Sequence, residues 1–345
     1  MKYALSRLLW LTCLAPLAAA HAQAEPHYRI AHQMALPGDE GWDYLAFEQG
    51  GHRLFVSHST RVLVIDTDKL AVVGEIPDTP GVHGIAIAPE LGRGYISAGR
   101  ANTVVVFDLK SLARLKEIKT TGEGPDAILY DPATQRVFAF NGHGRNATAI
   151  DARTEEVIGT IPLNAKPEFA TSDGKGRIYV NLEDQSSLAV LDPHKLTVVS
   201  VWPIAGCESP SGLALDAARE RLFAGCDNKV MAVVDGKSGH LLGTAPIGGG
   251  VDATAFDPGT GLAFASCGEG VLTVVRVGRS GRPEVAQSLP TQRGARTLAL
   301  DLRTHRVYLV TASFGPAPAP SAEHPHPRPA MLPGSFRLLV LEPNS

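Results

Sequence analysis

One aromatic residue recurs through this chain at nearly constant spacing, and this repeat restricts the possible fold more than any other feature. Phenylalanine or tyrosine occurs at intervals of 40 to 44 residues, at Phe55, Tyr95, Phe138, Tyr179, Phe223, Phe264 and Tyr308. Two positions earlier, six of the seven copies have arginine and the sixth copy has leucine: Arg53, Arg93, Arg136, Arg177, Arg221, Leu262 and Arg306. A fixed period of this length indicates seven repeats of one supersecondary unit.

Each repeat has the pattern of several short β-strands. Apolar and β-branched runs, such as residues 104–108 and 188–192, are separated by Gly, Pro, Asp and Asn. Four strands in about 42 residues is the size of a propeller blade. We therefore predict an all-β fold, a single seven-bladed β-propeller over residues 25–345; a β-helix or an open β-solenoid is the alternative.

The two ends of the chain indicate how the ring closes. The last repeat has strand patterns near residues 306–311 and 336–341 but none after them, whereas residues 28–36 precede the first complete repeat. We predict that this N-terminal strand joins the last blade as its outer strand, because the pairing removes an exposed sheet edge.

Residues 1–24 have the features of a signal peptide. Lys2 and Arg7 precede an apolar run over residues 8–20, and residues 22–24 fit an A-x-A cleavage site. We expect a periplasmic or secreted protein with no membrane span after processing. The formal net charge of −3 becomes more negative when these two basic residues leave, which disfavours nucleic acid as a partner without excluding it.

Three cysteines, Cys207, Cys226 and Cys267, remain after the signal peptide and its Cys13 are removed. An odd number in an oxidising compartment suggests one bridge and one free thiol. Cys207 and Cys226 belong to the fifth repeat, whereas Cys267 occupies the position of Cys226 one repeat later. We predict a Cys207–Cys226 disulfide with Cys267 free; three reduced thiols are the alternative.

Two segments resemble motifs of the YncE-like, or YVTN, β-propeller repeat proteins. Residues 102–108, NTVVVFD, are similar to that family's N-x-V-x-V-hydrophobic-D strand, and residues 210–216, PSGLALD, are similar to its P-x-G-hydrophobic-A pattern. The literal YVTN tetrapeptide is absent. The resemblance covers essentially the whole mature chain and implies the propeller fold. Because some members are regarded as single-stranded DNA binders, it also implies that function, for which the candidates here are Trp42, Tyr44, Arg145, Arg296 and Arg328.

The start of the innermost strand supplies one equivalent residue from each repeat, and in a propeller these residues face the mouth of the central channel. They are Asp43, His83, Asp126, Glu168, Ser211, Asp252 and Arg296. Two such carboxylates about 8 Å apart repel by roughly 2 kcal/mol at an effective dielectric near 20. The four acids therefore need Arg296, a cation or raised pKa values. We predict a ligand site here; the alternative is a purely structural ring that caps strands and binds water.

A proline-rich segment, residues 314–335, lies between the last two strand patterns of the seventh repeat. We expect it to connect the second and third strands on the same face as the channel mouth. Its prolines stiffen it, so His324, His326 and Arg328 can act as a lid over the ring. His143, in the corresponding connection of the third repeat, is a further ligand-binding candidate. A solvated loop is the alternative.

Two classes of function fit these residues. The first is a binding or scaffold protein that recognises a small polar ligand, a metal ion or a protein partner at the channel mouth. The second is a metal-dependent hydrolase or lactonase, with Asp43, Glu168 and Asp252 as metal ligands, His83 or Asp126 as general base and Arg296 stabilising an oxyanion. Imidazole with carboxylates suits zinc or copper, whereas carboxylates alone suit calcium or magnesium. The chain has no G-x-S-x-G elbow, P-loop or C-x-x-C-H motif.

Overall fold

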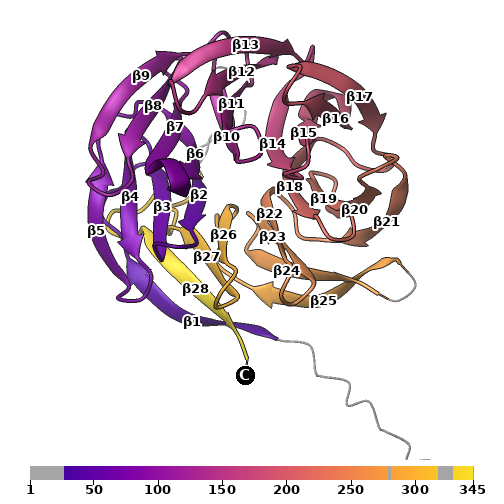
Figure 1. Cartoon of the computed structure of the whole chain (residues 1–345). Coiled ribbons are helices and arrows are strands. Elements are labelled where there is room, and N and C mark those ends of the chain that lie inside the picture. The colour runs from indigo at the N-terminus through magenta and orange to yellow at the C-terminus, as the bar shows by residue number, and fades with distance from the viewer. Residues whose placement is uncertain (1–26, 279–280, 318–328, 345) are drawn as a thin grey trace, which may run out of the picture.

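The computed structural model describes residues 27–278, 281–317 and 329–344, which form seven four-stranded antiparallel sheets arranged as a ring (Figure 1). In order from the centre outward, the first three blades contain β2 (Trp42–Glu48), β3 (Arg53–His58), β4 (Arg61–Asp66) and β5 (Ala71–Ile76); β6 (Val82–Ala88), β7 (Arg93–Ala98), β8 (Thr103–Asp108) and β9 (Arg114–Lys119); β10 (Pro125–Asp131), β11 (Arg136–Asn141), β12 (Asn146–Asp151) and β13 (Glu156–Pro162).

Blades four to six repeat this order. They contain β14 (Pro167–Ser172), β15 (Ile178–Leu182), β16 (Ser187–Asp192) and β17 (Thr197–Pro203); β18 (Pro210–Asp216), β19 (Arg221–Cys226), β20 (Val230–Asp235) and β21 (Leu241–Pro246); β22 (Val251–Asp257), β23 (Leu262–Cys267), β24 (Val271–Val277) and β25 (Pro283–Pro290). Two short 3-10 turns, η1 (Pro89–Leu91) and η2 (Glu183–Gln185), join strands in blades two and four.

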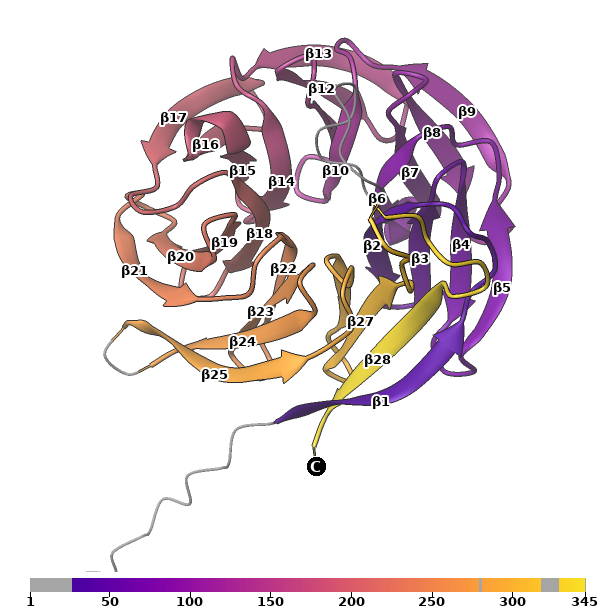
Figure 2. The same cartoon turned by 180° about the vertical axis from the view of Figure 1, so that it is seen from behind.

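Blade seven confirms the predicted closure. Its sheet has the order β26 (Leu298–Asp301), β27 (Arg306–Thr311), β28 (Arg337–Pro343) and β1 (Tyr28–Ala35), so the outermost strand comes from the N-terminus (Figure 2). Tyr28 is buried, packs edge-on against Phe264 of blade six at 5.0 Å and donates a hydrogen bond to the carbonyl of His305 at 3.0 Å. The first and last strands of the propeller are therefore held in one sheet.

The recurring aromatic residues, and several of the recurring arginines, hold neighbouring blades together. All seven aromatic side chains are buried between sheets. The arginines lie at the edge of this layer, where Arg53 donates to the carbonyl of Leu109 in blade two at 2.8 Å and Arg177 donates to the carbonyl of Gly236 in blade five at 3.3 Å. Aspartates at the ends of the inner strands, or directly after the end in blade four, accept N–H donors from the following turn: Asp131, Asp173, Asp216, Asp257 and Asp301.

Glycine at the third position of two inner strands is required by the close approach of the neighbouring inner strand. A Cβ added at Gly212 of β18 would lie 2.5 Å from the backbone nitrogen of Thr254 in β22, and one at Gly84 of β6 would lie 2.9 Å from the carbonyl oxygen of Asp126 in β10. The narrow centre of the ring thus requires residues without side chains at these positions. Within the described residues, no helix is long and apolar enough to cross a membrane.

Candidate functional site

The strand register places six of the seven ring residues at equivalent positions in their blades, directly after the first paired residue of the inner strand, and Arg296 lies two residues before β26. In blade three Pro125 pairs with Asn141 and Asp126 follows it, and in blade four Pro167 pairs with Leu182 and Glu168 follows it. The spacing to the repeat aromatic is one residue shorter in blade four because its first turn spans residues 174–176, whereas blade three uses residues 132–135.

Polar side chains fix the backbone of the ring across blade boundaries. Ser97 of blade two donates to the carbonyl of Asp126, Asn181 of blade four donates to that of Ser211 at 2.7 Å, and Thr297 of blade seven donates to that of Asp43 at 2.8 Å. Each of these bonds joins one blade to the first strand of the next. The ring is therefore preorganised by the sheets rather than carried on loops.

The first group in the ring joins blades one, two and three. His83 Nδ1 lies 2.6 Å from Asp43 Oδ2 and 3.6 Å from Asp126 Oδ1, and all three side chains are partly exposed. One ligand atom from each of these residues lies within 4.8 Å of the other two, which is the spacing around a bound metal ion. Among the described residues, this group satisfies that geometry.

The second group joins blades five, six, seven and one. Arg296 Nε lies 2.6 Å from Asp252 Oδ2, its Nη2 lies 3.7 Å from Asp43, and Ser211 donates to Asp252 at 3.2 Å. Arg296 also donates to the carbonyl of Trp42 at 3.1 Å. Arg296 therefore neutralises the Asp252 side of the ring, which is one of the three forms of compensation that the sequence analysis required for the ring acids.

Glu168 is compensated by a residue that the sequence analysis did not identify. Lys166 Nζ lies 2.8 Å from Glu168 and also contacts Glu183 of η2. Lys166 stands two residues before Glu168, in the connection that leads to the ring. This position was the only feature of the sequence that could have identified Lys166 as the counter-charge of Glu168. The structure brings Asp43 together with His83 and Asp126, and it places Glu168 and Asp252 with Lys166 and Arg296.

Burial shifts the proton affinities of the ring acids. Burial raises the pKa of Asp126 to about 6, with His83 opposing the shift and Asp43 adding to it. Burial and the charge of Asp126 raise the pKa of Glu168 to about 8. The hydrogen bond to Asp43 raises the pKa of His83, against its partial burial. The carboxylates thus coexist through a combination of counter-charges and raised pKa values.

Two aromatic rings from opposite blades meet inside the ring. Tyr44 of β2 stacks on Phe169 of β14 with 4.4 Å between ring centroids. The Tyr44 hydroxyl is buried without a hydrogen-bond partner among the described residues, and its pKa is raised by burial and by the charges of Asp126 and Glu168. The stack joins blades one and four across the channel.

A pocket of about 460 Å³ opens beside the first group. It lies over the boundaries of blades two, three and four and is lined by both acidic and basic side chains, including His83, Arg100, Asp126, His143 and Lys166. The volume is that of a small-molecule site. Of the predicted ligand-binding residues, His83, Asp126 and His143 therefore share one cavity.

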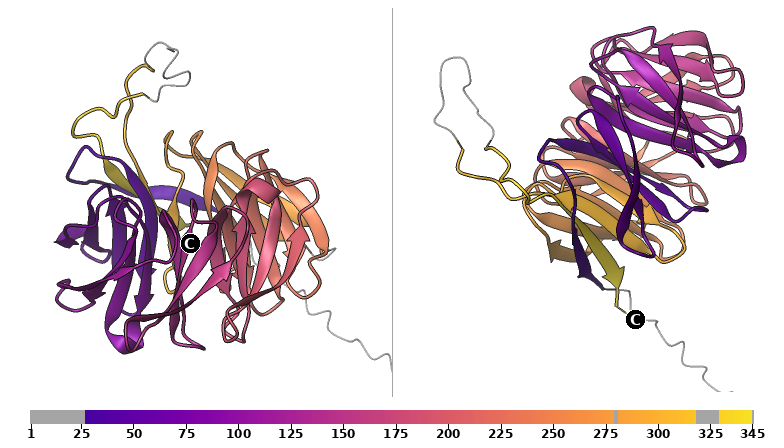
Figure 3. Two further views of the ribbon diagram at one scale, coloured as in Figure 1. Left: turned by 90° about the horizontal axis from the view of Figure 1, so that it is seen from above. Right: turned by 90° about the vertical axis from the view of Figure 1, so that its left-hand side faces the viewer.

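The described ends of the proline-rich segment, residues 314–317 and 329–335, extend above one face of the propeller (Figure 3), and Phe314 lies 6.1 Å from Trp42 between ring centroids. Phe314 and Met331 form a β-bridge, and Trp42 stacks on Phe336 at 5.2 Å. The segment connects β27 to β28, as predicted. His324, His326 and Arg328, the proposed lid residues, lie outside the described residues.

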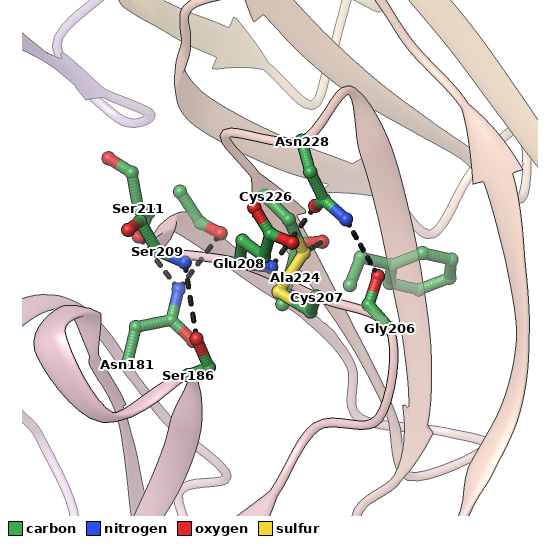
Figure 4. Close-up of a disulfide and its surroundings, with 12 residues drawn as sticks. Asn181, Ser186, Gly206, Cys207, Glu208, Ser209, Ser211, Ala224, Cys226 and Asn228 are labelled. Atoms are coloured by element: carbon green, nitrogen blue, oxygen red, sulfur yellow. Dashed lines mark hydrogen bonds between the residues drawn. A yellow bond between two sulfur atoms is a disulfide. The ribbon is translucent and has the colours of Figure 1, made fainter.

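The predicted disulfide is present, and it fastens the chain that enters blade five (Figure 4). Cys207 is bonded to Cys226, while Cys267 is free and buried. Around the bridge, Asn228 donates to the carbonyl of Gly206 at 3.0 Å and accepts the N–H of Glu208 at 3.1 Å. These contacts fix the connection just before Ser211 of the ring.

Comparison with known proteins supports the fold and leaves the function open. No family model matches the chain. Antigen Lp49 from Leptospira interrogans serogroup Icterohaemorrhagiae serovar copenhageni, strain Fiocruz L1-130, is 36% identical over 94 residues, which is 27% of this chain and 20% of that protein. The chain is thus matched to about a fifth of the length of this curated relative.

Solved propellers resemble the chain over most of its length. Hydrazine synthase from Kuenenia stuttgartiensis gives a TM-score of 0.69 at 16% identity and covers 79% of this chain and 93% of its own. The WD40 repeats of RRP9 give 0.75 at 11% identity, with coverage of 92% and 99%, and U3-55K gives 0.73 at 11%, with coverage of 90% and 98%. At such identities the likeness establishes the β-propeller fold alone.

Proposed function

We propose that the protein is an exported binding protein that holds a divalent metal ion at the channel mouth and recognises a small polar ligand in the adjoining pocket. The observation that carries this proposal is the convergence of Asp43, His83 and Asp126, from three consecutive blades, within 4.8 Å of one another. The blade motifs that resemble YncE-like proteins are consistent with an exported propeller, and kinship with that family is part of the proposal.

The donor set selects the class of ion. Two carboxylates with one imidazole suit a borderline ion such as zinc or copper, whereas calcium and magnesium prefer oxygen ligands throughout. Three protein ligands leave a coordination position for a ligand that enters from the pocket. Lys166 and Arg100 on the pocket wall supply donors for polar or anionic groups of that ligand, and Asp126 faces the same space.

Thermal unfolding of chelator-treated protein, with and without zinc, tests the proposal. His305 provides a matched control because its Nδ1 lies 2.7 Å from Asp257 at the opposite end of the strands. Among the described residues, that pair does not belong to a group of three ligands. We expect zinc to raise the melting temperature of the wild type and of His305→Gln but not of His83→Gln. Equal responses of both variants, or no response of the wild type, contradict the proposal.

A metal-dependent hydrolase or lactonase is the second candidate, and one observation favours it. Asp126 borders the pocket beside His83, with 3.6 Å between its Oδ1 and His83 Nδ1, so its carboxylate is placed to act as a general base toward a molecule in that pocket. Here Asp43 and His83 hold the ion and Asp126 accepts the proton of the attacking water. Lactone or ester turnover that is abolished both by a chelator and by Asp126→Asn supports this function, and absence of turnover with zinc present removes it.

The geometry gives no comparable support to single-stranded DNA binding. Trp42 is buried against Phe336, Tyr44 stacks on Phe169, and Arg145 Nη1 lies 2.6 Å from Asp184. Base stacking needs exposed aromatic faces beside free cations, and these candidates are already engaged within the protein.

A further inference from the structure

The boundary between blades five and six departs from the rest of the propeller at the end of the strands opposite the channel mouth. In four blades the repeat arginine lies opposite an aspartate that ends the third strand: Arg53 and Asp66, Arg93 and Asp108, Arg136 and Asp151, Arg221 and Asp235. In blade six the same two places hold Leu262 and Arg276, so an acidic position has become basic.

The replaced aspartate normally shapes the next hairpin turn. Asp235, for example, accepts the N–H groups of Lys237 and Ser238. In blade six β24 continues to Val277, and Gly278 donates instead to the carbonyl of Arg282 at 3.0 Å. β24 and β25 stay paired as far as Val277 and Pro283, whereas β20 and β21 stay paired only as far as Val234 and Leu241, so the third strand of blade six runs two residues further before its turn.

This change leaves one arginine without its usual acceptor. The repeat arginines of blades one, three and four donate to backbone carbonyls in the chain just after the third strand of the following blade: Arg53 to Leu109, Arg136 to Pro193 and His194, Arg177 to Gly236. Arg221 of blade five is placed to reach the same point of blade six. Among the described residues, no hydrogen bond or ion pair is made by its side chain.

A pocket of about 640 Å³ occupies this boundary. Its polar wall contains Arg219, Arg221 and Arg276 together with Asp216 and Glu284, and its apolar wall is formed by Phe223, Phe256, Leu262 and Val277. Arg219 lies 3.2 Å from Asp216, and Arg276 lies 3.1 Å from Glu284. Two of the three guanidinium groups are therefore matched by carboxylates, and the charge of Arg221 is left over.

We propose that this pocket binds a small monocarboxylate with an apolar body. The planar guanidinium of Arg221 presents paired donors that suit the two oxygens of a carboxylate. One unmatched positive charge balances a single negative charge, which favours a carboxylate over a doubly charged phosphate. The apolar body lies against Phe256 and Val277. This site is separate from the metal site, because it lies at the other end of the inner strands.

Calorimetric titration of the purified protein with benzoate, and separately with inorganic phosphate, tests the site. Arg221→Gln is expected to weaken benzoate binding by at least about tenfold and to leave the melting temperature unchanged, because it removes no internal bond. Arg177→Gln, the matched control from blade four, removes a bond to Gly236 and is expected to lower the melting temperature while benzoate affinity stays the same.

Three outcomes overturn this site: no saturable binding of benzoate by the wild type, equal benzoate affinity in Arg221→Gln, or saturable binding of phosphate without benzoate. Arg221→Lys provides a second variant, which keeps the charge and loses the paired donors. We expect its affinity to lie below that of the wild type and above that of Arg221→Gln, and an affinity equal to the wild type contradicts the paired geometry.

Discussion

His83 of blade two donates toward Asp43 of blade one with 2.6 Å between Nδ1 and Oδ2, a contact that joins residues 40 positions apart in the sequence. Asp126 of blade three approaches the same nitrogen at 3.6 Å. Because the hydroxyls of Thr297 and Ser97 donate to the backbone carbonyls of Asp43 and Asp126, a metal ion that displaces the proton of His83 meets ligands whose backbone is already positioned.

Removing the third ligand should weaken the metal site without dismantling its other half. Asp126→Asn keeps the His83–Asp43 contact and is expected to lower zinc affinity by about tenfold or more, as measured by competition with a chromophoric chelator. Asp227→Asn, an exposed acid in blade five, is the control and should leave the affinity unchanged. Wild-type affinity in Asp126→Asn would contradict the assigned ligand set.

Glu168 should make the stability of the protein depend on pH. Its pKa of about 8 is above its usual value, so the folded state binds this proton more tightly than the unfolded state. The resulting stabilisation is complete below about pH 4.5 and is lost as the pH rises through about 8. The wild type therefore loses stability between pH 5 and pH 8, whereas Glu168→Gln has no titrating group at this position. The melting temperature of the variant minus that of the wild type should increase by about 2 °C or more over this pH range.

Scanning calorimetry across this pH range measures the difference. Glu183→Gln, which removes the other carboxylate on Lys166, controls for loss of an ion pair with that lysine. Asp126 faces Glu168 and titrates in the same range, so the comparison is made in the Asp126→Asn background as well. A melting-temperature difference that does not vary with pH would contradict the raised pKa of Glu168.

The disulfide should contribute measurably to stability. The bridge closes a loop with a sequence separation of 19 residues, for which loop-closure entropy gives on the order of 3 kcal/mol. Cys226→Ser is expected to lower the unfolding free energy by about that amount. Because burial raises the pKa of Cys267 to about 12, its thiol should resist an aromatic disulfide reagent until the protein is unfolded. When the protein without residues 1–24 is unfolded in the absence of a reductant, the reagent should react with one thiol per chain. Reaction with more than one thiol would contradict the Cys207–Cys226 bond.

The stacked pair inside the channel makes a separate prediction. The Tyr44 hydroxyl is buried without a partner, so Tyr44→Phe should leave the unfolding free energy unchanged or raise it by about 1 kcal/mol. Double substitution of Tyr44 and Phe169 by alanine should reveal a coupling of about 0.5–1.5 kcal/mol. Urea unfolding measures both quantities, and a Tyr44→Phe variant that loses more than about 1 kcal/mol would show that the hydroxyl is bonded.

The repeat made the fold predictable because each copy carries the same buried aromatic, and seven copies fix both the blade and the ring. The closing strand followed from an unmatched strand pattern before the first repeat, and it pairs with β28 as expected. The register of Glu168 also followed, since a one-residue shorter turn in blade four accounts for its spacing.

The pairings within the site could not be predicted in the same way. Sequence position placed Asp43, Asp126 and Asp252 on one ring. The side chain that pairs with each carboxylate, however, depends on side-chain length and on the residues in the connections between blades. Lys166, which carries no repeat signature, pairs with Glu168, and Tyr44 points inward to Phe169. Leu262 was visible in the sequence as the one copy without the repeat arginine. That Arg221 of the preceding blade has no backbone acceptor could be seen only in the structure, because it depends on where the third strand of blade six ends.

Anomalous diffraction from crystals soaked in zinc tests the central claim most directly, because it locates the ion without relying on a change in stability. The account predicts a peak at the channel mouth within about 2.0–2.2 Å of a nitrogen of His83 and of carboxylate oxygens of Asp43 and Asp126. Crystals of His83→Gln should lack that peak. A wild-type crystal with no peak among these three residues, or with zinc bound only elsewhere, would contradict the account.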